Sequence, residues 1–326
     1  MGLLINGVWH DRTGYNTEST GGRFVRESPG FRNWVSAEPD ADFPAAAGRY
    51  HLYVALACPW AHRVLIMRKL KGLEDVIGVS VLDPYMGPNG WWFSNAPGTD
   101  PDPLYGVLYL HELYQKADSS YTGRATTPTL WDRERETIVS NESADILRML
   151  NQAFNAFAER PDLDYYPPAL REAIDSINEP IYNHVNNGVY KTGFATTQTA
   201  YESEYDALFA TLDWLDRLLA DQRYLLGGQI TEADWRLFVT LVRFDAVYFG
   251  HFKCNQNRIA DYPNLSGYLR ELYQIPGVSE TVNFHQIKRH YYTSHPWINP
   301  NGIVPKGPTL ALDAPHGRDH LPRADT

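Results

Sequence analysis

The sequence predicts two domains of different fold class: an α/β domain built on a mixed four-stranded sheet, followed by an all-helical domain. The chain has 326 residues, a length that favours two domains over one. Strand-like and helix-like segments alternate up to about residue 158, whereas from about residue 170 the apolar residues recur at helical spacing. We expect an N-terminal arm at 1–48, the α/β domain at 49–158, the helical domain at 170–300 and a surface tail at 301–326.

The first half of the α/β domain has the order strand, helix, strand. The run 50–57 is β-prone, apolar and of strand length, and Pro59 ends it. Apolar residues at helical spacing follow as far as Gly72, which is placed to end a helix. Residues 76–82 read as a second strand, and 83–103 as a long loop rich in Gly, Pro and Trp.

The second half of this domain has the order helix, hairpin, helix. We expect a helix over 104–117, paired strands at 127–132 and 137–140, and a final helix over 141–154. This order of elements is typical of the thioredoxin-like fold, a mixed sheet with helices on both faces. Residues 1–48 combine Gly, Pro, Ser and Asp with scattered aromatics, which predicts an irregular arm lying on this domain.

The helical domain is predicted from four segments with a 3.6-residue period, at 171–190, 198–222, 230–249 and 264–278. Thr231 and Asp234 form a capping signature at the start of the third, with Ile230 as a hydrophobic staple. The last ~25 residues are rich in Pro, His, Asp and Gly and show no period, so we expect a surface tail there.

Composition excludes several classes of function. The net charge of −10 argues against a nucleic-acid partner, which needs clustered Lys and Arg. The sequence contains no run of about 18 apolar residues, so we expect no membrane span. The N-terminus has neither the basic region nor the cleavage site of a secretory signal, so we expect a cytoplasmic protein. The histidines show no metal-ligand spacing, and we expect no metal.

Cys58 lies where the first strand gives way to the first helix. Unpaired N–H groups and the positive end of the helix dipole favour the thiolate there, and Pro59 suits the first turn. His62 and Arg63, one turn further on, add positive potential. Ala61 stands where a dithiol oxidoreductase has its second Cys, so Cys58 is expected to need an external thiol. The alternative is a small buried hydrophobic residue, but the motifs that follow in order favour the functional interpretation.

Two downstream motifs complete a site for a peptide-like ligand. A cis peptide before Pro128 would place the main chain of Thr127 beside Cys58, where it can pair with an extended ligand; an ordinary edge-strand proline is the alternative. Glu142 and Ser143 open a helix, where they can hold an ammonium and a carboxylate, although plain N-capping would also explain them. The other cysteine, Cys254, lacks a helix-start context and is interpreted as structural.

Five segments of the chain stand out together: YHLYVALACPWAHRVLIMRKLKGLE, SNESADILRMLN, NNGVYKTGFA, RFDAVYFGHFKCN and HYYTSHPWINP. With these segments, the chain resembles the glutathionyl-hydroquinone reductases, the Xi class of the glutathione transferases. The resemblance extends over roughly residues 5–305, and the Cys-Pro-Trp-Ala motif with the loop around Trp91 is specific to this family.

The resemblance implies a thioredoxin-like glutathione-binding domain, a helical glutathione-transferase C-terminal domain and a homodimer. It implies glutathione as co-substrate, glutathionyl-hydroquinones or glutathionyl ketones as substrates, and Cys58 as the catalytic nucleophile. By motif, the glutathione-binding residues are Trp91, Arg124, Thr127, Glu142 and Ser143. The hydroquinone-binding residues are Tyr182 and one of Tyr291 and Tyr292. The family more often has Val at position 127, and we expect little effect because that contact is through the main chain.

The implied reaction is an attack of Cys58 on the glutathionyl sulfur, which displaces the hydroquinone and leaves a mixed disulfide. A second glutathione then releases oxidised glutathione. Two rival hypotheses stand beside it. One is an Omega-like thioltransferase or dehydroascorbate reductase of the same fold, and the other is a non-catalytic binding module, which would have no need of an activated thiol.

Overall fold

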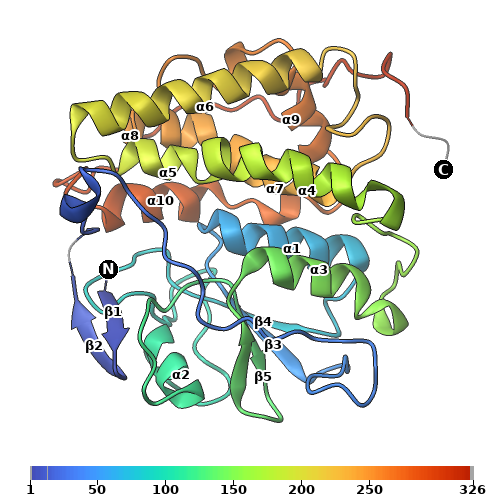
Figure 1. The fold of residues 1–326 in the computed structure, drawn as a ribbon. Coiled ribbons are helices and arrows are strands. Elements are labelled where there is room, and N and C mark those ends of the chain that lie inside the picture. Colours follow the sequence, from blue (N-terminus) through green and yellow to red (C-terminus); the bar gives the residue numbers. More distant parts are fainter. Residues whose placement is uncertain (1, 13, 324–326) are drawn as a thin grey trace. The chain divides into compact units, whose positions relative to one another are not determined.

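A four-stranded mixed sheet forms the centre of the first of two units in the computed structural model, which describes residues 2–12 and 14–323 (Figure 1). The strands are β3 (Tyr50–Val54), β4 (Gly78–Val81), β5 (Thr129–Asp132) and β6 (Thr137–Ser140), in the spatial order β4-β3-β5-β6. β3 is parallel to β4 and antiparallel to β5, and β5 and β6 form the expected hairpin. All five residues of β3 are buried, as expected of an interior strand covered on both faces.

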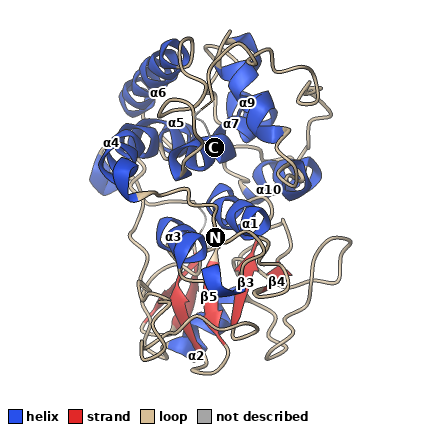
Figure 2. Ribbon diagram, turned by 90° about the vertical axis from the view of Figure 1, so that its right-hand side faces the viewer, coloured by secondary structure: helices blue, strands red, loops and turns tan. Residues whose placement is uncertain are grey.

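Three helices cover this sheet. Helices α1 (Pro59–Lys71) and α3 (Ser143–Gln152) lie side by side on one face, and α2 (Leu110–Ala117) lies on the other (Figure 2). The predicted order of elements is therefore confirmed, and Gly72 ends α1 in the left-handed conformation (φ 65°).

Helix α2 is shorter than the predicted 104–117. The buried carboxylate of Asp102 accepts hydrogen bonds from the backbone N–H groups of the residues that follow it, which folds them into a loop instead of a helical turn. These N–H groups belong to Leu104 (3.2 Å), Tyr105 (2.9 Å) and Val107 (3.3 Å).

The N-terminal arm is more regular than predicted. Strands β1 (Gly2–Ile5) and β2 (Val8–Asp11) form an antiparallel hairpin. Its turn is Asn6-Gly7, with φ angles of 48° and 75°, the dipeptide that two-residue hairpin turns prefer. The sequence therefore contained the signal for a hairpin, although we expected an irregular arm. Leu4 pairs with Gly123 through two backbone hydrogen bonds of 2.8 and 2.9 Å, which joins the hairpin to the first unit.

The second unit is helical. Its α-helices are α4 (Arg171–Pro180), α5 (Gly188–Gly193), α6 (Gln198–Leu218), α7 (Glu232–Arg243), α8 (Phe249–His251) and α9 (Leu265–Tyr273). Two π-helical segments, Ile181–Asn186 and Phe244–Tyr248, link α4 to α5 and α7 to α8. The predicted capping box of α7 is present, with the Thr231 N–H donating to Asp234 Oδ2 at 2.8 Å. None of the described helices is long and apolar enough to cross a membrane.

The division of the chain differs from the expected boundaries. The first unit takes the described residues of 1–14, 27–164 and 281–304, and the second takes 15–26, 165–280 and the described part of 305–326. Helix α10 (Phe284–Ser294) therefore belongs with the sheet, although its sequence lies in the expected helical domain. The reason is a set of hydrogen bonds between α10 and the loop that follows β4, described below.

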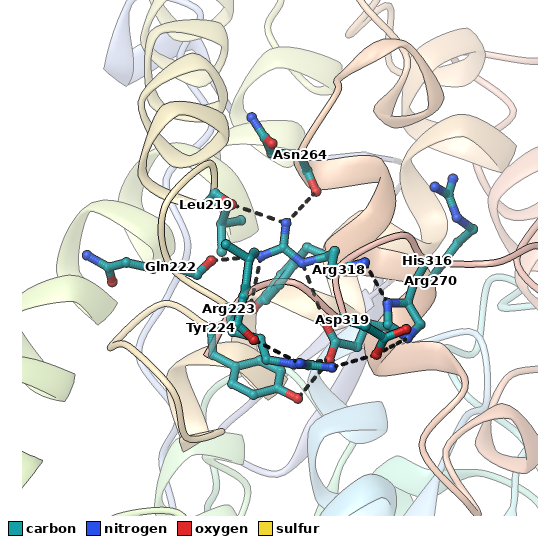
Figure 3. A network of polar contacts seen from close by, with 12 residues as sticks. Leu219, Gln222, Arg223, Tyr224, Asn264, Arg270, His316, Arg318 and Asp319 are labelled. Carbon is teal, nitrogen blue, oxygen red and sulfur yellow. Dashed lines mark hydrogen bonds and ion pairs between the residues drawn. The ribbon is translucent and has the colours of Figure 1, made fainter. Parts of the chain in front are cut away.

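The expected surface tail is anchored by a buried arginine. Arg318 is 4% exposed, and its guanidinium group donates to the carbonyl oxygens of Leu219, Gln222 and Arg223 at 3.1, 2.8 and 2.8 Å (Figure 3). These carbonyls follow the end of α6, where helical partners run out. The guanidinium has enough N–H donors to satisfy several of them, so this part of the tail is integral to the second unit.

Candidate active site

Cys58 is the N-cap residue of α1, with extended backbone angles (φ −74°, ψ 121°). Its N–H donates to Ala55 O at 2.9 Å, and its carbonyl accepts the N–H of His62 at 3.0 Å. The side chain is 8% exposed. The thiol therefore lies where the first-turn N–H groups of α1 lack helical partners.

Thr127 lies beside this thiol although the two residues are 69 positions apart. Cys58 Sγ donates to the carbonyl oxygen of Thr127 at 3.3 Å, and the peptide bond between Thr127 and Pro128 is cis. The main chain, and not the side chain, makes this contact. The Thr127 hydroxyl is buried and has no hydrogen-bond partner among the described residues.

Arg63 joins the start of α1 to the start of α3. Its guanidinium is buried, lies 3.4 Å from Ser143 Oγ and stacks 4.6 Å from the ring of Trp60. The imidazole of His62, also buried, is engaged with Thr281 Oγ1 at 2.7 Å. Arg63 thus bonds to another predicted site residue, Ser143.

Glu142 and Ser143 occupy the N-cap and first position of α3. Glu142 Oε1 accepts the Ala144 N–H at 2.8 Å, so this carboxylate caps the helix. Ser143 Oγ lies 3.4 Å from the same carboxylate oxygen. Just before them, Asn141 Nδ2 donates to Thr126 Oγ1 at 3.1 Å, which ties the start of α3 to the segment of Thr127. The capping role is thus seen directly, and a ligand-binding role stays a proposal.

Arg124 lies next to the N-terminal hairpin. Its guanidinium donates to Gly2 O at 3.4 Å and lies 3.9 Å from a carboxylate oxygen of Glu27. Because Gly123 pairs with Leu4, the hairpin sets the position of Arg124 from both the main chain and the side chain. The arm is therefore part of the construction of this region.

Trp91 lies in the long loop after β4 and is 8% exposed. Its carbonyl accepts the N–H of Leu110 at 2.9 Å. Its indole stacks on the imidazole of His290, with ring centroids 4.8 Å apart and planes inclined by 20°. His290 comes from α10 and was not among the predicted site residues. The HYYTSHPWINP segment was the only sequence signal that included it.

The predicted tyrosines fall in both units. Tyr291 and Tyr292 lie on α10, in the same unit as Cys58, whereas Tyr182 lies in the π-helical segment of the second unit. Tyr291 is 1% exposed, and its neighbour Tyr292 is half-buried. Burial raises the pKa of Tyr292. Of the adjacent pair, Tyr292 is therefore the more exposed residue.

Both cysteines are free thiols, but their surroundings differ. Cys254 is fully buried in the second unit, and burial raises the pKa of its thiol. This fits the structural role expected for it. Within residues 2–12 and 14–323, no group of three His, Cys, Asp or Glu side chains is arranged to hold a metal ion.

A thioredoxin-like sheet with a lone cysteine at the start of α1, followed by a helical unit, defines a glutathione transferase. Two family models agree with this class. The model for "Glutathione S-transferase, N-terminal domain" matches residues 57–153, and the model for "Glutathione S-transferase, C-terminal domain" matches residues 198–271.

Similar proteins show to which class of the glutathione transferases the chain belongs. Glutathionyl-hydroquinone reductase YqjG of Escherichia coli (strain K12) is 56% identical over 98% of this chain and 99% of its own, and its glutathione-bound structure matches with a TM-score of 0.89. Glutathionyl-hydroquinone reductase PcpF of Sphingobium chlorophenolicum is 54% identical over 96% of this chain and 98% of its own. The Xi-class glutathione transferase of Natrialba magadii is 48% identical, with a TM-score of 0.92 over 99% of this chain and 98% of its own. The chain belongs to the Xi class of the glutathione transferases, the family of the glutathionyl-hydroquinone reductases.

Proposed function

We propose that this chain reduces glutathionyl-hydroquinones to hydroquinones, with glutathione as reductant and Cys58 as nucleophile. The observation that carries the proposal is the placement of Cys58, whose thiol lies at the start of α1, 3.3 Å from the carbonyl oxygen of Thr127. Position 61 is Ala, so the neighbouring thiol of a dithiol mechanism is missing. A lone thiol of this kind forms a mixed disulfide with an external thiol, as the proposed reaction requires.

In the first half-reaction, Cys58 attacks the sulfur of the glutathionyl group. A sulfur–sulfur bond forms, the bond from sulfur to the ring carbon breaks, and its electron pair goes to the carbon. That carbon takes a proton, and we assign its delivery to Tyr292. Because burial raises the pKa of Tyr292, its hydroxyl keeps its proton at neutral pH and can act as general acid. The products are the hydroquinone and a Cys58–glutathione mixed disulfide.

In the second half-reaction, the thiolate of another glutathione attacks the glutathionyl sulfur of this disulfide. Oxidised glutathione leaves and the Cys58 thiolate returns. The proton lost by the incoming thiol replaces the one that Tyr292 gave up. The net reaction consumes one glutathione and one glutathionyl-hydroquinone, and yields one hydroquinone and one oxidised glutathione.

We assign the tripeptide to groups around Cys58. The Thr127 main chain pairs with the cysteinyl part of glutathione as an added strand does. The start of α3, with Ser143 and the backbone N–H groups of its first turn, suits a carboxylate, and Glu142 suits an ammonium. Trp91 and Arg124 complete the glutathione site. Tyr182 and Tyr291 complete the proposed hydroquinone site.

The remaining expectations belong to the same proposal. We propose that the chain works in the cytoplasm as a homodimer, without a metal ion and without a nucleic-acid or membrane partner. Two observations support the last part: the net charge of −10 opposes phosphate binding, and the closely similar relatives bear the names of enzymes that act on small molecules.

The test is the release of hydroquinone from glutathionyl-menadiol in the presence of glutathione, followed by chromatography. The native protein, a Cys58→Ser variant and a Cys254→Ser control are compared. Release by the native protein and the control, lost in Cys58→Ser, would support the proposal. Reduction of a small mixed disulfide without release of hydroquinone would replace it with a thioltransferase, and no reaction in either assay would indicate a binding module.

A further inference from the structure

One face of helix α10 is polar, and its side chains bind the loop that carries Trp91. Three nearly buried side chains on this helix are spaced four residues apart, so they share a face. Each bonds to a backbone group of the loop at 83–103. The bonds join Gln286 Nε2 to Gly98 O at 2.7 Å, His290 Nδ1 to Pro84 O at 2.8 Å, and Ser294 Oγ to Met86 N at 3.0 Å.

His290 is the central residue of this face, and its bond determines its tautomer. A carbonyl oxygen such as that of Pro84 only accepts, so Nδ1 must carry the proton. Ser294 Oγ lies 3.3 Å from the same nitrogen. One edge of the imidazole is thereby fixed to the loop, and the plane of the ring is fixed with it.

The same ring meets Trp91 with its face. The centroids are 4.8 Å apart and the planes are inclined by only 20°, which is a stacked arrangement. The loop is therefore held at the carbonyl of Pro84 and at the indole of Trp91 by one side chain. Phe at position 290 would provide the stack without the bond, and Asn the bond without the stack. His provides both.

We infer that His290 is a positioning residue of the glutathione site, which sets the orientation of the Trp91 indole. The inference rests on the proposed assignment of Trp91 to glutathione. Because His290 precedes Tyr291 and Tyr292 on α10, the same helix sets both the Trp91 loop and the proposed hydroquinone-binding tyrosines. His290 thus connects the two halves of the proposed site.

The experiment titrates the full-length protein with glutathione by calorimetry. The variants are His290→Phe, His290→Asn and His290→Ala, and His285→Ala is the control, because His285 is exposed on the same helix. Loss of a stack and a hydrogen bond should weaken glutathione binding on the order of 10-fold in His290→Ala. His290→Phe and His290→Asn, which each keep one contact, should lose roughly 3-fold, and the control should bind as the native protein does.

A second readout tests positioning apart from stability. Imidazole ¹⁵N spectra of the native protein should show the Nδ1–H tautomer for His290. Equal glutathione affinity in all variants, or an Nε2–H tautomer, would overturn the inference. If His290→Ala does not fold, the Phe and Asn variants decide. The calorimetric titration uses glutathione alone, without a glutathionyl-hydroquinone. If the native protein binds glutathione in this titration but releases no hydroquinone in the chromatographic assay, only the proposed reaction is refuted.

Discussion

Cys58 and Cys254 show how surroundings assign different roles to one residue type. Cys58 begins a helix, and its thiol meets a carbonyl oxygen from a distant segment at 3.3 Å. Cys254 follows the π-helical segment and α8, and is fully buried with its sulfur near the carbonyls of Val189 and Phe252. The first context suits a reacting thiol, and the second an inert one.

This contrast predicts selective alkylation. Because burial raises the pKa of Cys254, its thiol should stay protonated and unreactive in the folded protein even at about pH 8.5, the pKa of a free cysteine. Iodoacetamide should therefore add one group per chain at this pH, at Cys58, and a second only in denaturant. Peptide mass spectrometry locates the label. A native protein that takes up two labels without denaturant, or that is labelled first at Cys254, would contradict this assignment.

At the scale of elements, the capping box of α7 is the feature best anticipated from sequence. Asp234 is fully buried and accepts hydrogen bonds at both carboxylate oxygens. Its donors are Thr231 N (2.8 Å), Thr231 Oγ1 (3.1 Å), Leu225 N (3.0 Å) and Tyr268 OH (2.8 Å). Sequence spacing indicates the first two donors, and only the fold brings in Leu225 and Tyr268.

The difference between a buried and an exposed cap can be measured. Asp234→Ala leaves several buried donors without an acceptor and should lower the free energy of unfolding by about 3 kcal/mol or more. Thr197→Ala removes the exposed cap of α6, whose hydroxyl accepts the Ala200 N–H at 3.4 Å, and should cost about 0.5 kcal/mol. Urea unfolding compares the two variants with the native protein. Equal costs would show that the extra donors of Asp234 contribute little.

At the scale of the whole chain, each unit collects segments that are distant in sequence. The first unit recruits α10, and the second recruits residues 15–26 and the C-terminal segment. Buried charges fasten that segment. Glu271 is 4% exposed and pairs with Arg223 at 2.6 Å and with Arg318 at 3.4 Å. Two guanidinium groups thus form ion pairs with one buried carboxylate and donate hydrogen bonds to several carbonyl oxygens.

Removal of one partner from such a network should be costly. Arg318→Ala would uncover carbonyl oxygens after α6 and weaken the pairing of Glu271, so we expect a loss of about 3 to 5 kcal/mol in the free energy of unfolding. Arg323→Ala is the matched control, since Arg323 is 64% exposed and lies 3.7 Å from Glu271. It should cost less than about 1 kcal/mol. Similar denaturation midpoints for the two variants would mean that the C-terminal segment contributes nothing to the second unit.

Local sequence patterns determined much of the secondary structure of this protein. The strand–helix order, the position of Cys58 before Pro59, the hairpin of β5 and β6 and the cap at Thr231 all follow from interactions between residues close in sequence. The Asn6-Gly7 turn is also determined by neighbouring residues, although the composition of the arm led us to expect an irregular segment there. Such features are readable because propensity and periodicity act within one or two turns.

Tertiary structure decided the remainder, because the relevant partners are far apart along the chain. The bond from Cys58 to Thr127 spans 69 residues, and the one from His290 to Pro84 spans 206. The placement of α10 in the sheet unit depends on hydrogen bonds to backbone carbonyl and amide groups, and so does the burial of Arg318. These backbone groups are left without other partners only after the loops that carry them have folded. Side-chain type showed that such residues can form hydrogen bonds, and the fold alone determined which groups they bind.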